Sequence, residues 1–194
     1  LCKENNIRTL GIVNVVGSSI AREADNVFYT LAGPEISVAT TKAYSTQLIA
    51  AYVLAIQFAK VKGTISEEQY AAYIKELETL PDKIQRIIDD KERIQWVAAK
   101  YANAKDVFFI GRGIDYAVSM EGSLKLKEIS YIHSEAYAAG ELKHGTISLI
   151  EDGILVVSIL TQEALYEKMI SNMVEVKCRG AYLMGLTTAG NYNI

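Results

Sequence analysis

The sequence predicts an α/β protein in which a parallel sheet is flanked by helices. Short apolar runs alternate along the chain with longer helical patterns, as in DVFFIG (106–111) followed by IDYAVSMEGSLKLKEISY (114–131). Strands that alternate with helices in this way form parallel sheets with helices on both faces. The composition agrees, since 194 residues with 50% hydrophobic and 22% charged residues are typical of a globular protein.

The amino-terminal part of the chain predicts two strands and one long helix. The run TLGIVNVV (9–16) is continuously apolar, as in a buried parallel strand, and NVFYTLAG (26–33) predicts a second, shorter strand. Residues 40–61 have the pattern of a helix that is apolar over much of its circumference. We therefore expect this helix to be buried.

The middle of the chain predicts connecting helices. Ser66 and Gln69 form a capping signature at the start of a helix over 66–80, which should end before Pro81. The following segment, 82–103, is also helical in pattern and rich in charge. The predicted division of the chain is a first domain at 1–80, connecting helices at 81–105 and a second domain at 106–194.

Two segments near the ends of the chain share a pattern. RTLGIVNVVGSS (8–19) and RGAYLMGLTTAG (179–190) each contain a basic residue, an apolar strand, and glycine with small polar residues. If they are equivalent strands of two copies of one fold, the chain contains the back of one domain and the front of another. The expectation is therefore two incomplete domains, and the start at Leu1 rather than at a methionine also suggests a fragment.

Charge and cysteine content exclude several classes of function. The net charge of −3 gives no reason to expect nucleic acid or an anionic membrane as a partner. Cys2 and Cys178 form neither a disulfide framework nor a C-x-x-C motif, so we interpret them as free thiols in a reducing cytoplasm. No apolar run approaches the roughly 20 residues of a membrane span. The lone His144 with scattered carboxylates lacks metal-ligand spacing, and no metal or cofactor is expected.

The segment EGSLKLKEISYIHSEAYAAGELKHG (121–145) is unusually dense in ionisable residues. On a helix, Glu121, Lys125 and Glu128 fall within an arc of about 60°, so one face presents carboxylate, ammonium and carboxylate. One interpretation is a solvated face with weak salt links. The other is a reactive site, because the residues that follow the helix are of a kind that crosses the mouth of an α/β sheet, where ligands bind.

The two histidines of the chain lie within this segment. His144, between Lys143 and Gly145, would be a suitable proton shuttle near neutral pH, and its alternative role is a surface histidine that caps a turn. His133 is the weaker candidate, and a packed structural role is expected for it. The GRG sequence at 111–113 lacks the third glycine of a dinucleotide motif and is interpreted as a tight strand-to-helix turn.

Three segments together resemble the glutamine–fructose-6-phosphate aminotransferase (isomerising) family, also called glucosamine-6-phosphate synthases. They are VVGSSIAREAD (15–25), GPEISVATTKAYSTQL (33–48) and the segment at 121–145. The resemblance covers almost the whole chain. It implies two sugar-isomerase (SIS) domains that convert fructose 6-phosphate and ammonia into glucosamine 6-phosphate, with a separate glutaminase domain that supplies the ammonia.

The resemblance also implies roles for individual residues. Glu128 in LKLKEIS would be the isomerisation base, and Lys125 would assist proton transfer near the sugar. His144 would help open the sugar ring from the neighbouring subunit, which requires a homodimer. Val38, Ala39 and Thr40 would contact the substrate. Members of the family commonly have serine at the position of Thr40, and threonine keeps the hydroxyl group.

Other parts of the family's site would lie outside this chain. The phosphate-binding loop would precede Leu1, and the lysine that forms a Schiff base would follow Ile194. The resemblance therefore implies an internal fragment that does not complete the reaction alone. Two alternatives stay open: a sugar-phosphate deaminase or deglycase built on the same domains, and a regulatory SIS module that binds sugar phosphates without turnover.

Overall fold

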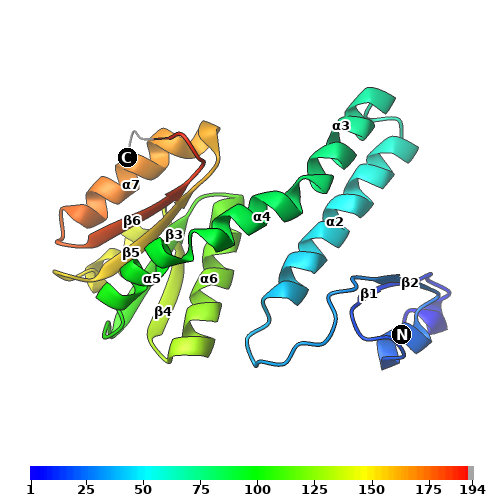
Figure 1. The fold of residues 1–194 in the computed structure, drawn as a ribbon, viewed down its shortest axis with the longest axis horizontal. Coiled ribbons are helices and arrows are strands. Elements are labelled where there is room, and N and C mark those ends of the chain that lie inside the picture. The colour runs from blue at the N-terminus through cyan, green and yellow to red at the C-terminus, as the bar shows by residue number, and fades with distance from the viewer. Residues whose placement is uncertain (192–194) are drawn as a thin grey trace. The chain divides into compact units, whose positions relative to one another are not determined.

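The computed structural model describes residues 1–191, so the last three residues of the predicted domain 106–194 lie outside the described residues. The chain divides into two compact units, Leu1–Glu92 and Arg93–Ile194 (Figure 1). Each unit is described by itself. Among residues 1–191, no helix is long and apolar enough to cross a membrane.

The first unit begins with two parallel strands. Strand β1 (Leu10–Val13) pairs with β2 (Asn26–Tyr29), and helix α1 (Ser19–Glu23) lies between them in sequence. The parallel pairing agrees with the prediction, but the strand predicted at 9–16 ends at Val13 and one of its two faces is exposed. Directly after the strand, the Asn14 side chain donates a hydrogen bond to the Gly33 carbonyl at 2.6 Å and accepts one from the Ala32 N–H at 2.9 Å.

Three helices follow in the first unit. They are α2 (Lys42–Val61), α3 (Glu67–Glu78) and α4 (Leu80–Asp89). The predicted capping box is confirmed, since the Ser66 hydroxyl accepts from the Gln69 N–H at 3.2 Å and the Gln69 side chain accepts from the Ser66 N–H at 2.9 Å. Pro81 lies in the first turn of α4, where its missing N–H needs no partner.

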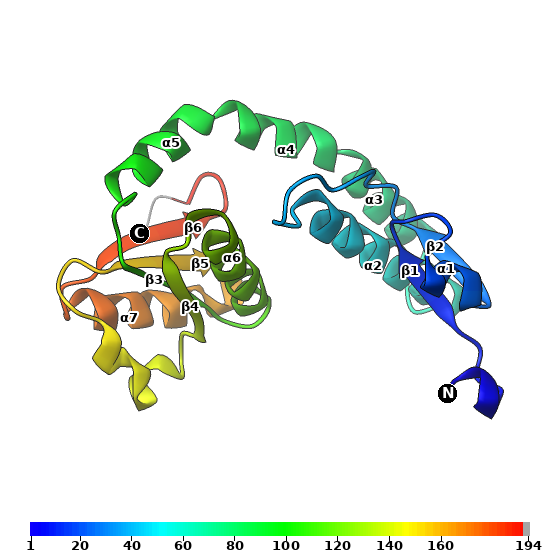
Figure 2. The same cartoon turned by 90° about the horizontal axis from the view of Figure 1, so that it is seen from below.

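The expected burial of the long helix is wrong for this chain. Only Ala43 and Ala50 of α2 are buried, whereas Tyr52, Phe58 and Val61 are exposed. Within the first unit, the main neighbour of α2 is α3, which lies along one side of it (Figures 1 and 2). An apolar circumference indicates that a helix can be covered on several sides, but it does not specify what covers it.

The second unit is a four-stranded parallel sheet with helices on both faces; the parallel sheet flanked by helices is as predicted, but one of its four strands is not. Its strands are β3 (Asp106–Gly111), β4 (His133–Ala138), β5 (Leu155–Leu160) and β6 (Tyr182–Thr187), in the spatial order β4-β3-β5-β6. Helix α5 (Lys91–Lys100) leads into this unit, α6 (Ile114–Ser130) connects β3 to β4, and α7 (Tyr166–Lys177) connects β5 to β6.

Alternating residues of the strands build two separate cores. Val156 and Leu160 of β5 pack with Met169 and Met173 of α7, whereas the neighbouring Val157 faces the core on the α6 side. Figures 1 and 2 accordingly show α6 and α7 on opposite faces of the sheet. Because both faces are covered, every residue of β5 is buried, as expected for a central parallel strand.

Strand β4 is missing from the sequence prediction, which treats the residues after α6 as an irregular crossing of the sheet. The structure places His133–Ala138 at the edge of the sheet, paired with β3 from Asp106↔His133 to Gly111↔Ala138. An edge strand has one exposed side and tolerates polar residues, so its hydrophobic pattern is weak. The ionisable residues of this segment weaken its apolar pattern, although its pairing with β3 is regular.

One buried hydroxyl in the central strand gives a test of these cores. Ser158 of β5 is fully buried, and among the described residues its hydroxyl has no hydrogen-bond partner. Ser158→Ala replaces the unpaired buried hydroxyl with a hydrogen atom and so removes a desolvation penalty, and it should raise the free energy of unfolding by about 1 kcal/mol. Urea unfolding of the variant and the unchanged protein measures this.

Ser119→Ala is the matched control, because the buried Ser119 hydroxyl donates to the Asp115 carbonyl at 2.8 Å. It should lower the free energy of unfolding by about 1 kcal/mol. If both variants are destabilised equally, the Ser158 hydroxyl has a partner such as an internal water, and our interpretation of it is wrong.

Candidate active site

The turn between β3 and α6 sets the position of the charged residues. A Cβ atom at Gly111 would lie 2.5 Å from the backbone of Asp115, and Gly113 has a φ of +55°. Only glycine fits such a close approach and readily adopts such a backbone angle. The predicted tight strand-to-helix turn at 111–113 is therefore confirmed.

A buried carboxylate then fixes the start of α6. Asp115 is 4% exposed, and its side chain accepts hydrogen bonds from the Thr161 N–H at 2.9 Å and the Thr161 hydroxyl at 2.6 Å. Thr161 directly follows β5, so the two bonds tie the first turn of the helix to the end of the central strand. The direction of every other α6 side chain follows from this attachment.

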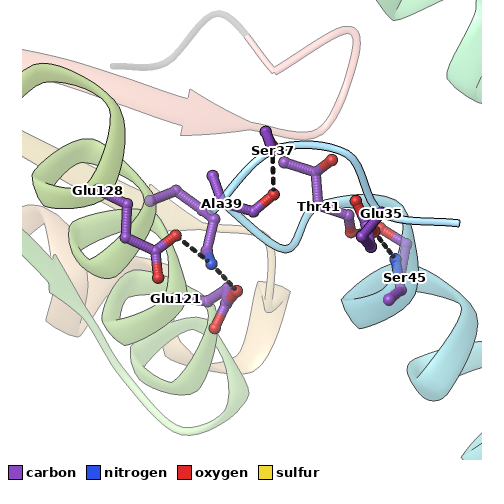
Figure 3. A network of polar contacts seen from close by, with 9 residues as sticks. Glu35, Ser37, Ala39, Thr41, Ser45, Glu121 and Glu128 are labelled. Atoms are coloured by element: carbon purple, nitrogen blue, oxygen red, sulfur yellow. Dashed lines mark hydrogen bonds and ion pairs between the residues drawn. The ribbon is translucent and has the colours of Figure 1, made fainter. Parts of the chain in front are cut away.

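Helix α6 brings together two of the predicted catalytic residues. The Lys125 Nζ atom lies 2.7 Å from Glu128 Oε2 and 3.4 Å from Glu121 Oε1, as the helical spacing predicts. Figure 3 shows Glu121 and Glu128 on the same side of the helix, with dashed lines from both to the ammonium group. The three side chains are 19–23% exposed, so they are partly shielded and not a fully solvated face.

The two carboxylates determine the charge state of the lysine. The hydrogen bond to Glu128 is the largest influence and raises the pKa of Lys125, outweighing burial, which acts in the opposite direction. The Lys125 side chain is therefore an ammonium ion throughout the neutral range. It can stabilise negative charge or deliver a proton, but it is a poor amine nucleophile.

The structure does not join His144 to this pair. His144 ends a 3₁₀ turn (Leu142–His144) after β4 and is exposed, and within residues 1–191 no hydrogen bond or ion pair links its ring to Glu128 or Lys125. The turn itself is anchored, because Leu142 is 1% exposed in the core and the Thr146 hydroxyl donates to the Leu142 carbonyl at 3.4 Å. The imidazole is therefore available to solvent.

His133 is not the packed structural histidine that the sequence suggests. Its ring is 59% exposed, with Nδ1 2.8 Å from Asp106 Oδ1 and Nε2 3.7 Å from Glu135 Oε1. The first residue of an edge strand has little cover, which explains the exposure. Glu135 also accepts a hydrogen bond from the Tyr137 hydroxyl, so these side chains form one polar chain along the edge of the sheet.

The predicted substrate loop precedes α2 in the first unit. Val38 and Thr40 are exposed, whereas Ala39 is 5% exposed. Two polar residues that the sequence prediction missed hold this loop: Glu35 accepts from the Ala43 N–H at 2.8 Å, and the Ser37 hydroxyl donates to the Ala39 carbonyl at 2.9 Å (Figure 3). A carboxylate shortly before a helix start is the signal that could have identified Glu35.

Comparison with known proteins defines the class of this chain. A family model of the SIS domain matches residues 1–57 and 100–194, and the chain belongs to that family. In sequence it matches the glutamine–fructose-6-phosphate aminotransferases [isomerizing], with 59% identity over 192 residues to the protein of Caldanaerobacter subterraneus subsp. tengcongensis and 54% to that of Clostridium tetani. Each alignment covers 99% of this chain but 32% of the relative, so the chain spans about a third of their length.

Solved structures agree with the sequence matches. The C-terminal domain of glucosamine-fructose-6-phosphate aminotransferase from Francisella tularensis matches with a TM-score of 0.91 and 38% identity, covering 96% of this chain and 53% of that chain. A glucosamine-6-phosphate deaminase from Thermotoga maritima matches with a TM-score of 0.69 and 25% identity, covering 95% and 53%. The predicted family and the α/β SIS fold are therefore confirmed, and the chain matches part of the C-terminal domain of the Francisella tularensis protein.

The polar chain on β4 gives a pH-dependent prediction. The hydrogen bond to Glu135, together with burial, raises the pKa of Tyr137 to about 12. Because the folded state favours the neutral phenol, this contribution to stability is complete below pH 10, the ordinary tyrosine value, and is lost as the pH rises from about 10 to 12. Ultraviolet difference titration of the protein against Tyr137→Phe should show one phenol that ionises near pH 12.

Glu135→Gln is the control for this titration, since it removes the charge that opposes ionisation of the phenol. In that variant the late-ionising phenol should shift toward pH 10. A wild-type titration in which Tyr137 ionises with the ordinary tyrosines would contradict the hydrogen bond as described.

Proposed function

We propose that this chain forms part of the isomerase module of a glutamine–fructose-6-phosphate aminotransferase. In the parent protein, glutamine supplies ammonia through a glutaminase domain, and the module converts fructose 6-phosphate and ammonia into glucosamine 6-phosphate and water. The observation that carries the proposal is the Glu121–Lys125–Glu128 arrangement within a chain that is 59% identical to such an enzyme. The parent acts in the cytoplasm.

Glu128 is the isomerisation base in this proposal. After ammonia has replaced the C2 oxygen, the carboxylate removes a proton from C1, which gives an enolamine, and returns a proton to C2 to form the amino aldose. One base can serve both carbons because they are adjacent. The hydrogen bond from Lys125 fixes the carboxylate in one orientation, as a base shared between two atoms requires.

Lys125 is the electrostatic partner of this step. Negative charge develops on the C2 nitrogen as the C1 proton leaves, and on the C1 oxygen as its hydroxyl proton is lost and C2 gains a proton; an ammonium ion nearby stabilises such charge. The raised pKa of Lys125 supports this role, since the group stays protonated during the reaction. Glu121 on the other side of the ammonium holds it in place at 3.4 Å.

The remaining predicted residues have roles in substrate binding and ring opening in this proposal. Val38, Ala39 and Thr40 contact the sugar through the loop before α2. His144 opens the sugar ring and reaches the site from the second subunit of a homodimer. Its exposed ring, without a bond to Glu128 or Lys125 among the described residues, supports this assignment, because a histidine that acts across an interface needs no partner in its own chain.

The second candidate function is a sugar-phosphate deaminase or deglycase on the same fold. The likeness to the Thermotoga maritima deaminase favours it, at 25% identity. We prefer the aminotransferase because its sequence match is much stronger, at 59% identity. Incubation of the parent protein with fructose 6-phosphate and glutamine decides between them: glucosamine 6-phosphate with glutamate supports the first function, and ammonia released only from an amino-sugar phosphate supports the second.

Glu128→Gln tests the base directly. An amide has nearly the same shape but cannot accept the proton, so isomerisation by the parent protein should fall by about 10²- to 10⁴-fold. Binding of glucosamine 6-phosphate, measured by calorimetry, should change little. The same substitution at the exposed Glu151 should leave turnover intact, and full activity of Glu128→Gln would remove Glu128 from this role.

Mixed dimers test whether His144 acts across the interface. His144→Ala and Glu128→Gln should each inactivate the homodimer. A purified heterodimer of the two variants contains one site with both residues intact, so it should regain about half of the wild-type activity. An inactive heterodimer would place His144 in the site of its own subunit and refute a shared site.

A further inference from the structure

The loop before α2 is closed by a carboxylate at its base. Glu35 Oε1 accepts a hydrogen bond from the Ala43 N–H at 2.8 Å, although the two residues are eight positions apart. The usual capping position is Thr41, but its side chain makes no capping hydrogen bond. Glu35 therefore replaces the ordinary cap of α2 and fixes both ends of the segment 36–41.

Two further hydrogen bonds hold the segment 36–41, one inside the segment and one to the first turn of α2. The Ser37 hydroxyl donates to the Ala39 carbonyl at 2.9 Å, and the Thr41 carbonyl accepts from Ser45 of α2 at 3.3 Å. The exposures alternate sharply, since Val38 is 89% exposed and its neighbour Ala39 is 5% exposed. The segment is thus a closed loop that presents selected residues and buries others.

The charge of Glu35 bears on which part of a substrate can lie at this end of α2. The amino end of a helix carries unpaired N–H groups and partial positive charge, and α2 is 20 residues long. Such an end attracts phosphate. With the Glu35 carboxylate already there, a second anion would meet repulsion, whereas neutral hydroxyl groups would not.

We infer that Glu35 is a positioning residue for substrate binding: its bond to Ala43 holds Val38–Thr40 in the shape that receives the uncharged part of the sugar phosphate. This inference rests on the proposed function, because that function assigns the contact to Val38–Thr40. Glu35 itself does not touch the reacting atoms. It acts only through the loop that it closes.

Steady-state kinetics of the parent protein test the inference. Glu35→Ala removes the acceptor and should raise the KM for fructose 6-phosphate about tenfold, with kcat within about twofold and the KM for glutamine unchanged. Glu35→Gln keeps a carbonyl acceptor of the same reach and should keep the KM within about threefold of wild type. Glu78→Ala, at an exposed position of α3, is the matched control and should change neither constant.

Ser37→Ala is a second variant that leaves the cap of α2 in place, in case Glu35→Ala fails to fold. It loses only the bond to the Ala39 carbonyl and should raise the same KM about two- to threefold. Glu35→Ala with a lowered melting temperature but an unchanged KM would show a purely structural role and overturn the inference. So would equal KM values for Ser37→Ala and wild type.

Calorimetry with glucosamine 6-phosphate separates this inference from the proposed function. If the wild-type parent binds the sugar phosphate but makes none, and Glu35→Ala weakens binding about tenfold, the proposed function fails and the role of Glu35 stands. If the wild-type protein does not bind it at all, both fail. If glucosamine 6-phosphate binds equally to the wild-type protein and to Glu35→Ala, the proposed role of Glu35 is wrong and the proposed function is unaffected.

Discussion

The attachment of Asp115 to Thr161 is the constraint on which the geometry of the second unit depends. Two hydrogen bonds, at 2.9 Å and 2.6 Å, join the first turn of α6 to the end of β5. A helix advances 100° per residue, so a fixed Asp115 fixes the rotation of α6 about its axis. Lys125 and Glu128 then lie away from the buried face of α6 that contains Ser119 and Ser123. The close approach of Gly111 to the Asp115 backbone fixes where the helix begins.

The sequence predicts best those features that depend on neighbours along the chain. The turn at 111–113, the capping box of α3 and the contacts of Lys125 all involve residues within four positions, where helix geometry and steric exclusion are decisive. The spacing of Glu121 and Glu128 around Lys125 is therefore enough to predict their pairing. The strong apolar runs of β3 and β5 are equally local signals.

Features that depend on distant partners are lost from the sequence. The strand His133–Ala138 is recognisable only once β3 lies beside it, because an edge position permits its ionisable residues. The burial of α2 depends on which segments pack against it, and the apolar pattern of its sequence does not identify those segments. The bond from Asp115 to Thr161 spans 46 positions, and no periodicity connects the two. The roles of His144 and Val38–Thr40 come from resemblance alone and stay predictions.

The two kinds of support in this chain suit the two tasks that the proposed function assigns. Glu128 must reach two adjacent carbon atoms without moving far, and it lies on a 17-residue helix with an ammonium ion hydrogen-bonded to it. Val38–Thr40 instead belong to a loop closed by the single bond from Glu35. A group on a regular helix is held by many backbone bonds, whereas a loop with one closing bond can open at the loss of that bond alone. The residues proposed to move protons are therefore held by a regular helix, whereas the shape of the residues proposed to contact the sugar depends on Glu35.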